Sequence, residues 1–510
     1  MVKRSTTRST LSRLRSLSRA SALLIAASLG AGIAPTPASA QETSASVGRL
    51  AADLGGLFNQ PANAVWGVYV RSLDRDDTLY TLNPRTLLDP ASTLKIVTLA
   101  AAADRLGWNH VYETTLYATV SATGLVADDL IVRGTGDPTI NALDSDVDPF
   151  ARWAAELQAL GITQIGGRVV GDDRAFADDI WTGWGPGWGW DDLGFGFAAP
   201  TGALQHHENV AELTIRPADE PGAPATVHVD PLSGLDLHSA VLTGRRDDEL
   251  ALTLRRLPGP ADLVLRGTIP VGSPTLSRSV AVENPTLFFV TALRHTLVTR
   301  GIAVGGEAVD IDQLPAEQRP PSPRSTEAIA RHRSPPLSDI AVDMMKDSHN
   351  LYAESLLRSI GLNSSGRAVS GGVDAITDTL ISWGLDDRQF QIADGSGLSP
   401  LNLISAETLT GILRHMHETP SHREPFAHAL PIAGRDGTLQ TRMRDTSATG
   451  NARAKTGTKT GVRALAGYVD TRDGERLAFA ILANNFQAGN RDIVRIIDRA
   501  VTRLAEFTRE

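Results

Sequence analysis

Cysteine is absent from this chain of 510 residues. Without thiols the protein has no disulfide framework and no thiolate chemistry, so packing must hold its fold together. After residue 40 the chain also lacks any stretch apolar enough to cross a membrane. With 42% hydrophobic and 21% charged residues, its composition is that of an ordinary globular protein. At roughly 100 to 200 residues per domain, the length predicts two to four domains.

The first 40 residues have the pattern of a secretory signal. An apolar run at 20–34 leads to Ala38-Ser39-Ala40, an A-x-A cleavage site. This run is far shorter than the ~20 residues of a spanning helix, so a retained single-pass anchor is the less favoured interpretation. We expect residues 1–40 to be removed and the protein to be exported to the periplasm or cell envelope. The positive charges before the run are Lys3, Arg4, Arg8, Arg13, Arg15 and Arg19.

Loss of these six charges changes the formal net charge from −9 to −15. Such a chain should repel nucleic acid and anionic envelope polymers unless it has a local basic patch. We therefore expect no nucleic-acid partner.

Two predicted β-hairpins lie at opposite ends of the chain. Residues 65–70 and 78–82 alternate in the manner of strands, and so do residues 462–469 and 477–483. A helix is predicted after each hairpin. The first, at 92–106, follows Pro90 and stops at Gly107, and the second runs over 492–507. These patterns predict one α/β (α+β) sheet domain assembled from both chain ends, with everything between them inserted.

The insert is expected to contain mostly β structure. Short strands are predicted at 211–215, 225–229 and 252–254, and the proline-rich stretch 315–336 has the composition of a return linker. We predict the following boundaries: a signal peptide at 1–40, a composite domain at 41–107 and 335–510, an inserted domain at 108–206 and 291–334, and a nested β-rich domain at 207–290.

The first motif with chemical meaning is Ser92-Thr93-Leu94-Lys95, at the start of the predicted helix. A serine hydroxyl needs a base within hydrogen-bond reach to become a nucleophile. A lysine one turn away on the same helix face can be that base if burial or nearby cations depress its pKa. Taken alone the motif is weak, because a helix cap followed by a solvated lysine has the same spacing.

The second motif, Ser348-His349-Asn350, lies at an interruption between two helical patterns. Such a break can direct Ser348 and Asn350 into a cleft. The hydroxyl can relay a proton between Lys95 and a leaving amine, and the amide can hold a substrate backbone.

The third motif, Lys-Thr-Gly, occurs twice in the segment 454–462, so its register must be chosen. The glycine allows an extended substrate to approach the strand, and the next residue can donate its backbone N–H to an oxyanion. Lys455-Thr456-Gly457-Thr458 meets both needs with a long strand following. Lys459 to Gly461 is expected to close the strand entry.

The order of the three motifs resembles the penicillin-binding protein and serine β-lactamase superfamily. Segments at 394–399, 430–439 and 134–139 are similar to those of the D-alanyl-D-alanine carboxypeptidase/endopeptidase class, peptidase family S13, the low-molecular-mass class C penicillin-binding proteins. The 256 residues from Ser92 to Ser348 agree, since this family carries two extra domains between these motifs. The resemblance runs from about Ala45 to the C-terminus.

This resemblance implies a catalytic domain of the transpeptidase type and an acyl-enzyme mechanism. Ser92 would attack the carbonyl between two D-alanines, with Lys95 as general base and Ser348 in the proton relay. Asn350 would orient the peptide of a peptidoglycan stem, and Lys455 with Thr456 would hold its terminal carboxylate. The implied oxyanion hole consists of the backbone N–H groups of Ser92 and Thr458. β-Lactams would be trapped at Ser92, and no cofactor or metal is implied.

Some positions depart from the family pattern. His349 stands where the family often has aspartate, and we expect its side chain to point away from the chemistry. Pro400 stands where relatives commonly have an arginine that binds the carboxylate of a meso-diaminopimelate side chain. Asp172 and Phe176 match the aspartate and aromatic residue that those relatives direct at the same side chain. The sequence therefore keeps the aspartate and the aromatic residue of this subsite and lacks its arginine.

Two further residue clusters are weighed against plainer explanations. Tryptophans 181, 184, 188 and 190 suggest a sugar-stacking platform, but structural packing is favoured. Histidines 415, 417, 422 and 428 match no zinc spacing, and a solvated helix and loop is favoured. Two alternatives to the peptidase remain: a β-lactamase, disfavoured by the long insert, and a non-catalytic peptidoglycan-binding envelope protein, disfavoured by the complete motifs.

Overall fold

The computed structural model describes residues 45–60, 63–143, 147–176, 183–257, 262–321 and 328–509. These residues fall within one compact unit. The predicted signal peptide at 1–40 lies outside them. No helix in the described ranges is both long enough and apolar enough to span a bilayer.

A five-stranded antiparallel sheet joins the two ends of the chain. Its order is β19-β20-β21-β1-β2. In the middle of it, Val68 lies opposite Leu82 on one side and Ile481 on the other. Both predicted hairpins are therefore confirmed, and the sheet comes from sequence-distant segments. Its strands are β1 (Val65–Ser72), β2 (Thr78–Leu82), β19 (Arg453–Lys459), β20 (Val462–Asp470) and β21 (Arg476–Asn484).

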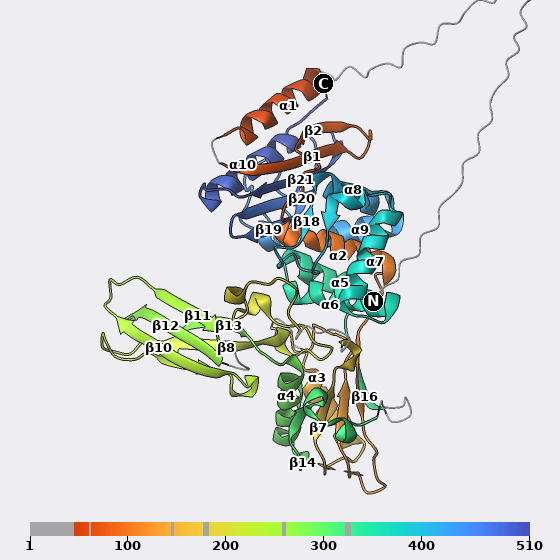
Figure 1. The fold of residues 1–510 in the computed structure, drawn as a ribbon, viewed down its shortest axis with the longest axis vertical. Helices are drawn as coiled ribbons and strands as arrows, with labels where there is room; N and C mark the ends of the chain where they lie inside the picture. The colour runs from red at the N-terminus through yellow and green to blue at the C-terminus, as the bar shows by residue number, and fades with distance from the viewer. Residues whose placement is uncertain are drawn as a thin grey trace, which may run out of the picture. The chain divides into compact units, whose positions relative to one another are not determined.

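Helices cover both faces of this sheet (Figure 1). On one face lie α1 (Ala45–Phe58) and α10 (Asn490–Ala505), whose apolar residues recur at helical spacing and pack with Leu465 and Phe479. On the other face α2 (Lys95–Arg105) and α8 (Ala406–Glu418) pack against alanines of β20 and β21. The small alanine side chains allow these helices to approach the sheet closely.

Further helices surround α2 and complete the second core. The longest of them, α6, packs against both α7 and α2 and is buried over most of its length. A two-stranded ladder of β17 (Phe390–Gln391) and β18 (Leu403–Ile404) borders the same region. The helices are α5 (Leu337–Lys346), α6 (Asn350–Ser365), α7 (Val369–Ser382) and α9 (Pro420–Ala429).

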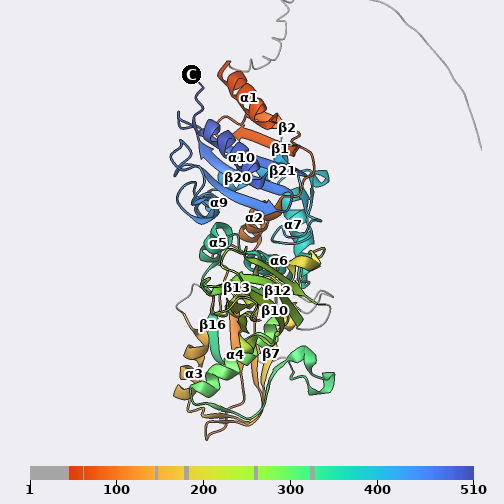
Figure 2. The ribbon, with the colours of Figure 1, turned by 90° about the vertical axis from the view of Figure 1, so that its left-hand side faces the viewer.

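The segment between α2 and α5 builds a second five-stranded sheet, in the order β15-β7-β5-β3-β16. Helices α3 (Pro149–Ala159) and α4 (Pro285–Thr299) share a core with it (Figure 2). The strands are β3 (Glu113–Tyr117), β5 (Leu130–Arg133), β7 (Val169–Asp172), β15 (Ala308–Asp310) and β16 (Ala328–Arg333). Three short strands, β4 (Leu125–Val126), β6 (Gln164–Ile165) and β14 (Ala303–Val304), form a small sheet beside it.

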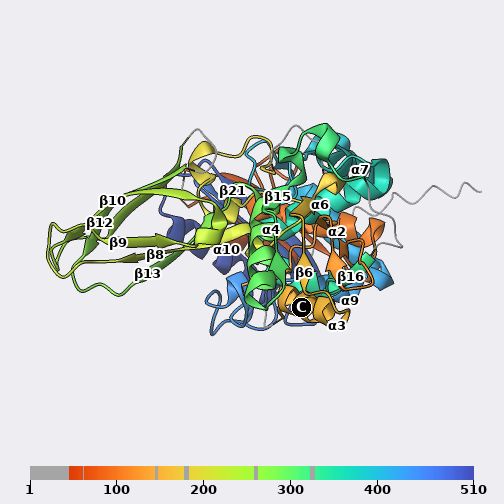
Figure 3. The ribbon, with the colours of Figure 1, turned by 90° about the horizontal axis from the view of Figure 1, so that it is seen from below.

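Two three-stranded sheets occupy residues 210–281, as the short-strand pattern predicts (Figure 3). One has the order β13-β8-β9 and the other β10-β12-β11, and residues such as Leu213 and Leu265 form their common core. The strands are β8 (Val210–Arg216), β9 (Thr226–Val229), β10 (Asp236–Gly244), β11 (Ala251–Arg256), β12 (Asp262–Pro270) and β13 (Leu276–Ala281).

The proline-rich stretch 315–336 is not only a linker. Its residues Ala328–Arg333 form β16, which pairs with β3. The prolines lie outside this strand, so they do not remove its ladder hydrogen bonds. The boundary predicted at 290/291 falls inside α4, which packs on β7 and β15. The exact domain limits stay predictions.

Candidate active site

Ser92 lies in a short 3₁₀ turn, η1 (Ala91–Leu94), that leads directly into α2 at Lys95. The residue before it, Ala91, has a positive φ of 45°. Such a conformation costs a non-glycine residue about 1–3 kcal/mol and persists only where surrounding structure holds it. The predicted helix at 92–106 is thus confirmed, with a 3₁₀ first turn.

Two glycines hold this turn in place. A Cβ on Gly397 would lie 2.0 Å from the Ala91 carbonyl oxygen, and a Cβ on Gly457 would lie 2.5 Å from that of Pro90. Both distances are too short for any side chain, so only glycine permits these approaches. The sequence suggested that Gly457 gives a substrate access to the strand. The contact with Pro90 accounts for the glycine without a substrate.

Lys95 is fully buried and does not match the solvated lysine of the plainer interpretation. Its Nζ lies 3.0 Å from Ser92 Oγ, 2.6 Å from Asn350 Oδ1 and 2.8 Å from the carbonyl oxygen of Ser396. Burial lowers the pKa of Lys95 to about 7, although the carboxylates of Asp394 and Glu354 act in the opposite direction. Near neutral pH a large fraction of Lys95 is therefore uncharged and able to accept a proton from Ser92.

Ser348 lies at the break between α5 and α6, where the sequence pattern places it. Its φ of 63° turns the chain sharply. Its Oγ accepts a hydrogen bond of 2.8 Å from Lys455 Nζ. Lys455 is fully buried, and this burial, together with the charge of Lys95, holds its pKa well below the ordinary value, while Asp347 opposes the shift. The second and third motifs are therefore in direct contact.

Asn350 is the first residue of α6 and uses both ends of its amide. Its Oδ1 accepts from Lys95, and its Nδ2 donates to the carbonyl oxygen of Phe197 at 2.7 Å. Phe197 belongs to the inserted segment, so one contact of the site comes from outside the domain that is assembled from both chain ends.

The Lys455 register of the third motif points into the site. β19 is the edge strand of its sheet, and Lys455 lies within it. Thr456, the next residue, donates from Oγ1 to Thr438 Oγ1 at 2.8 Å. Lys459, at the end of the strand, forms an ion pair of 2.8 Å with Asp89. Lys459 thus closes the strand, as expected, while Lys455 reaches Ser348.

Sequence analysis missed Glu354, which supports the loop beside Lys95. Its buried Oε1 accepts the backbone N–H groups of Gly395 and Ser396 at 3.0 and 2.9 Å. Arg358 lies one turn further along α6, with its Nη1 at 3.3 Å from Glu354 Oε2. Burial, and after it the charge of Asp394, raises the pKa of Glu354 to about 7. Glu354 lies four residues from both Asn350 and Arg358, which places the three side chains on one helix face. This spacing was the sequence signal that could have identified it.

Asp394 is a second buried carboxylate on the same loop. It accepts from the backbone N–H groups of Gly397 and Ser399 and from Asn402 Nδ2, at 2.6–2.8 Å. Trp188 Nε1, from the inserted segment, donates to it at 2.9 Å. The sequence singled out this loop as a family segment without giving Asp394 a role.

The two residues predicted to face a diaminopimelate side chain, Asp172 and Phe176, make other contacts in the structure. Asp172 is fully buried and receives two hydrogen bonds, of 2.8 and 2.9 Å, from the guanidinium of Arg174. Phe176 packs over Gly136 and lines a cavity of about 630 Å³. Within the described ranges, no hydrogen bond or ion pair joins either residue to the three motifs. Pro400 is exposed.

His349 points away from the site, as expected. Its Nε2 forms an ion pair of 2.9 Å with Glu208, and its ring stacks on Tyr352 at 4.3 Å. Burial raises the pKa of Glu208, but the hydrogen bond and charge of His349 outweigh it and lower that pKa overall.

The tryptophans that the structure describes are held by packing and hydrogen bonds. Trp184 Nε1 donates to Ala198, and Trp190 Nε1 donates to Arg256, both at backbone carbonyl oxygens. Trp190 is half exposed, whereas Trp188 is buried. Trp181 lies outside the described residues. The four histidines lie on α8 and α9, where for example His415 stacks on Trp383.

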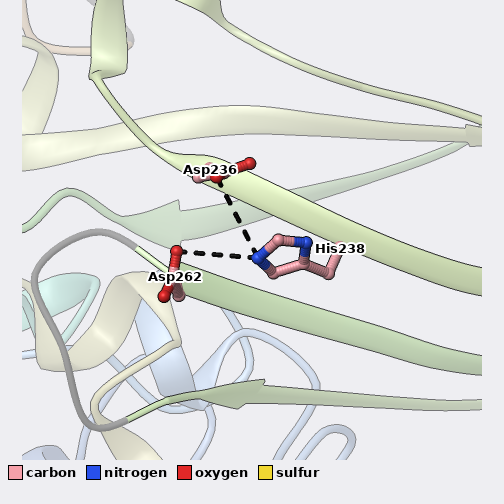
Figure 4. A group of neighbouring side chains, drawn as sticks. All are labelled: Asp236, His238 and Asp262. Atoms are coloured by element: carbon pink, nitrogen blue, oxygen red, sulfur yellow. Dashed lines mark ion pairs between the residues drawn. The ribbon is translucent and has the colours of Figure 1, made fainter.

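Two groups of side chains have the spacing of metal ligands in the described part of the chain. Asp236, His238 and Asp262 lie together on β10 and β12, with His238 Nε2 at 4.0 and 3.6 Å from the two carboxylates (Figure 4). They are largely exposed, and their contacts are ion pairs on a strand surface. Asp173, Asp310 and Asp312 form the second group, beside the cavity that Phe176 lines. Neither group includes a residue of the three motifs.

The chain matches the D-Ala-D-Ala carboxypeptidase 3 (S13) family over residues 50–507. It is 33% identical over 490 residues to the D-alanyl-D-alanine carboxypeptidase of Actinomadura sp. (strain R39), covering 92% of this chain and 87% of that protein. Its structure is similar to penicillin binding protein 4 (dacB) from Haemophilus influenzae, with a TM-score of 0.79 and 26% identity, covering 90% of this chain and 99% of that one. The same protein complexed with a β-lactam gives a TM-score of 0.72 at 25% identity, over 89% and 100% of the two chains.

Proposed function

Because the chain belongs to the D-Ala-D-Ala carboxypeptidase 3 (S13) family, we propose that Ser92 is the nucleophile with which it cleaves peptidoglycan stem peptides and their cross-links. The enzyme is a serine-type D-Ala-D-Ala carboxypeptidase. The observation that carries the assignment of roles is the buried Lys95, which touches Ser92, Asn350 and the Ser396 carbonyl at once.

In the acylation step, uncharged Lys95 takes the proton of Ser92 while Oγ attacks the carbonyl between two D-alanines. A base with a pKa close to the working pH is the most effective for this transfer, and the pKa of about 7 at Lys95 meets that condition. The negative charge that develops on the carbonyl oxygen is stabilised by the backbone N–H groups of Ser92 and Thr458.

Departure of D-alanine requires a proton on its amine. Ser348 is the proposed relay: it gives its proton to the amine and receives the proton that Lys95 took from Ser92, while Lys455, in contact at 2.8 Å, stabilises it during the transfer. Asn350 orients the peptide, and Lys455 with Thr456 holds the terminal carboxylate. Water then hydrolyses the acyl-enzyme and regenerates Ser92. A β-lactam reacts at the same serine but leaves no separate amine, which supports covalent trapping of penicillin.

The third residue of the stem peptide is proposed to lie near Asp172 and Phe176. Arg174 already neutralises Asp172, so this carboxylate by itself does not select a cationic side chain. With Pro400 in place of an arginine, the subsite also lacks the usual partner for a carboxylate. We therefore propose a less selective third-residue subsite than in relatives with the full pair.

Peptidoglycan lies outside the cytoplasmic membrane, so we propose that the enzyme acts in the cell envelope. The signal pattern at 1–40 supports this location.

The proposal is tested with purified protein, a labelled penicillin and a stem pentapeptide. Wild-type protein should bind one penicillin covalently at Ser92 and release D-alanine, and Ser92→Ala should do neither. Equal D-alanine release by both proteins would support a non-catalytic envelope protein instead. Rapid penicillin turnover without a stable adduct would support a β-lactamase.

A further inference from the structure

A groove of about 680 Å³ runs along the outer face of α10 and reaches the active-site strand. Thr458 and Arg463 line it at the strand end, and Arg491, Arg495 and Arg499 line it along the helix. Thr458 is the residue proposed to donate an N–H to the oxyanion. The groove therefore adjoins the strand residue that carries the proposed oxyanion donor.

Positive charge dominates this groove. Arg491, Arg495 and Arg499 are spaced four residues apart, so they project from one face of α10, and all three are exposed. Of the three, only Arg495 has an ion-pair partner in the described ranges, Asp492. The remaining carboxylate, Asp498, is paired with Arg442 at 2.6 Å.

This local excess of arginine stands out in a chain whose formal net charge is −9. The groove is thus a basic patch on a molecule of negative net charge. Arginine binds carboxylates through paired hydrogen bonds, which favours a carboxylate-bearing occupant.

Strand geometry relates the groove to the proposed ligands of the terminal carboxylate. Side chains alternate along a strand, so Thr456 and Thr458 share one face of β19, while Lys455 and Gly457 share the other. Thr456 is the proposed ligand of the terminal carboxylate. Lys455, from the other face, is the second proposed ligand of that carboxylate. A substrate that continues beyond it can therefore pass along the face of Thr458 and its neighbour Arg463, which line the groove.

On the basis of the proposed function, we propose that this groove binds the second, carboxylate-bearing stem peptide of a peptidoglycan cross-link. In an uncross-linked pentapeptide the leaving group is D-alanine, which ends at its own carboxylate. In a cross-link the leaving amine belongs to a second peptide that continues past that point. Both reactions break one C–N bond, protonate the leaving amine and end in hydrolysis of the acyl-enzyme. Only the cross-linked substrate can reach the arginines.

The test compares the two substrates in wild-type protein and in a triple variant with Arg491→Gln, Arg495→Gln and Arg499→Gln. We expect kcat/KM for a cross-linked muropeptide dimer to fall about tenfold, mainly through KM, because charge-assisted contacts to the second peptide are lost. The uncross-linked pentapeptide should be hydrolysed within about twofold of the wild-type rate. Raising the salt concentration should reduce the dimer rate of wild-type protein and leave that of the variant unchanged.

A matched control replaces three exposed arginines elsewhere, with Arg245→Gln, Arg246→Gln and Arg388→Gln, and should affect neither substrate. The corresponding lysine variants of the groove should retain at least part of the dimer preference. An unchanged dimer rate in the glutamine variant, or an equal loss on both substrates, would overturn the inference. Absence of D-alanine release from the pentapeptide by wild-type protein would instead overturn the proposed function.

Discussion

At the scale of single residues, the protonation of Lys95 decides whether Ser92 can react. Lys95 has exchanged its contact with water for three protein oxygens, and its pKa is lowered to about 7 as a result. Lys455, equally buried, has its pKa lowered in the same direction and adds a second cationic group nearby. The charge of Lys95 contributes to the shift at Lys455, so the site disfavours a positive charge on both lysines at once.

The acylation rate should therefore depend on pH near neutrality. Below pH 7 Lys95 gains a proton and can no longer accept one from Ser92, so the rate should fall about tenfold for each further pH unit. The second-order rate of penicillin acylation, followed from pH 5 to 9, measures this limb. A flat profile across this range would contradict the role of Lys95 as base.

Glu354→Gln should move that limb and weaken the fold. The carboxylate of Glu354 raises the pKa of Lys95, so its removal should shift the acid limb of acylation to lower pH. It also removes the ion pair of Glu354 with the buried Arg358, which should cost about 1.5–3 kcal/mol. Urea unfolding and the pH profile measure the two effects. A purely structural role of Glu354 would lower stability but leave the limb in place.

At the scale of elements, the turn before α2 depends on glycines from two other segments. Gly397 comes from the loop beside α6 and Gly457 from β19, and both meet the backbone of residues 90–91. The positive φ of Ala91 is stabilised by this enclosure and by a hydrogen bond of 2.8 Å from its N–H to Asp89. The position of the nucleophile is thus a property of three packed elements.

Gly397→Ala should therefore displace the nucleophile. Its Cβ would meet the Ala91 oxygen at 2.0 Å, in addition to strain from a φ of 86°. We expect a loss of at least 2 kcal/mol in stability and a drop of about tenfold or more in acylation. Gly384→Ala is the matched control, since Gly384 has a φ of 81° but no atom within 4 Å of its Cβ. It should cost only about 1 kcal/mol and leave acylation unchanged.

At the scale of the whole molecule, the inserted segment takes part in the site. Trp188 donates to Asp394, the Phe197 carbonyl accepts from Asn350, and Glu208 pairs with His349. Each contact meets a residue in or beside one of the motif loops. The insert therefore supports the catalytic site directly, because Trp188, the Phe197 carbonyl and Glu208 contact the loops that contain or flank the motif residues.

Trp188→Phe tests this coupling. The substitution keeps an aromatic ring but removes the N–H donor to the fully buried Asp394, which should cost about 1–3 kcal/mol. We expect slower acylation by a few fold, because the loop that holds the Ser396 carbonyl against Lys95 loses a support. Trp190→Phe is the control: its indole is 51% exposed, and its loss should change neither thermal stability nor acylation measurably. Equal effects of the two changes would argue against coupling through Asp394.

Local patterns were sufficient for much of this molecule. The hairpins follow from strand alternation around short polar turns, and the start and end of the helix that carries Lys95 follow from Pro90 and Gly107. Even the choice of Lys455 over Lys459 was accessible, because only Lys455 is followed by further strand residues before the turn. In each case the sequence signal lies within a few residues of the feature that it predicts. The backbone can adopt that local structure without a partner that is distant in sequence.

Tertiary structure decided what required groups distant in sequence to meet. The pKa of Lys95 depends on burial beneath α6 and on Asp394 and Glu354, which no local pattern connects to it. Pairing of Asp172 with Arg174 was open in the sequence, since two residues of opposite charge this close in a chain need not face each other. The sequence by itself determined which chemical groups the protein has and in what order. Packing determined which of them lost their water, and with it their ordinary charge, because desolvation is a property of the surroundings rather than of the residue.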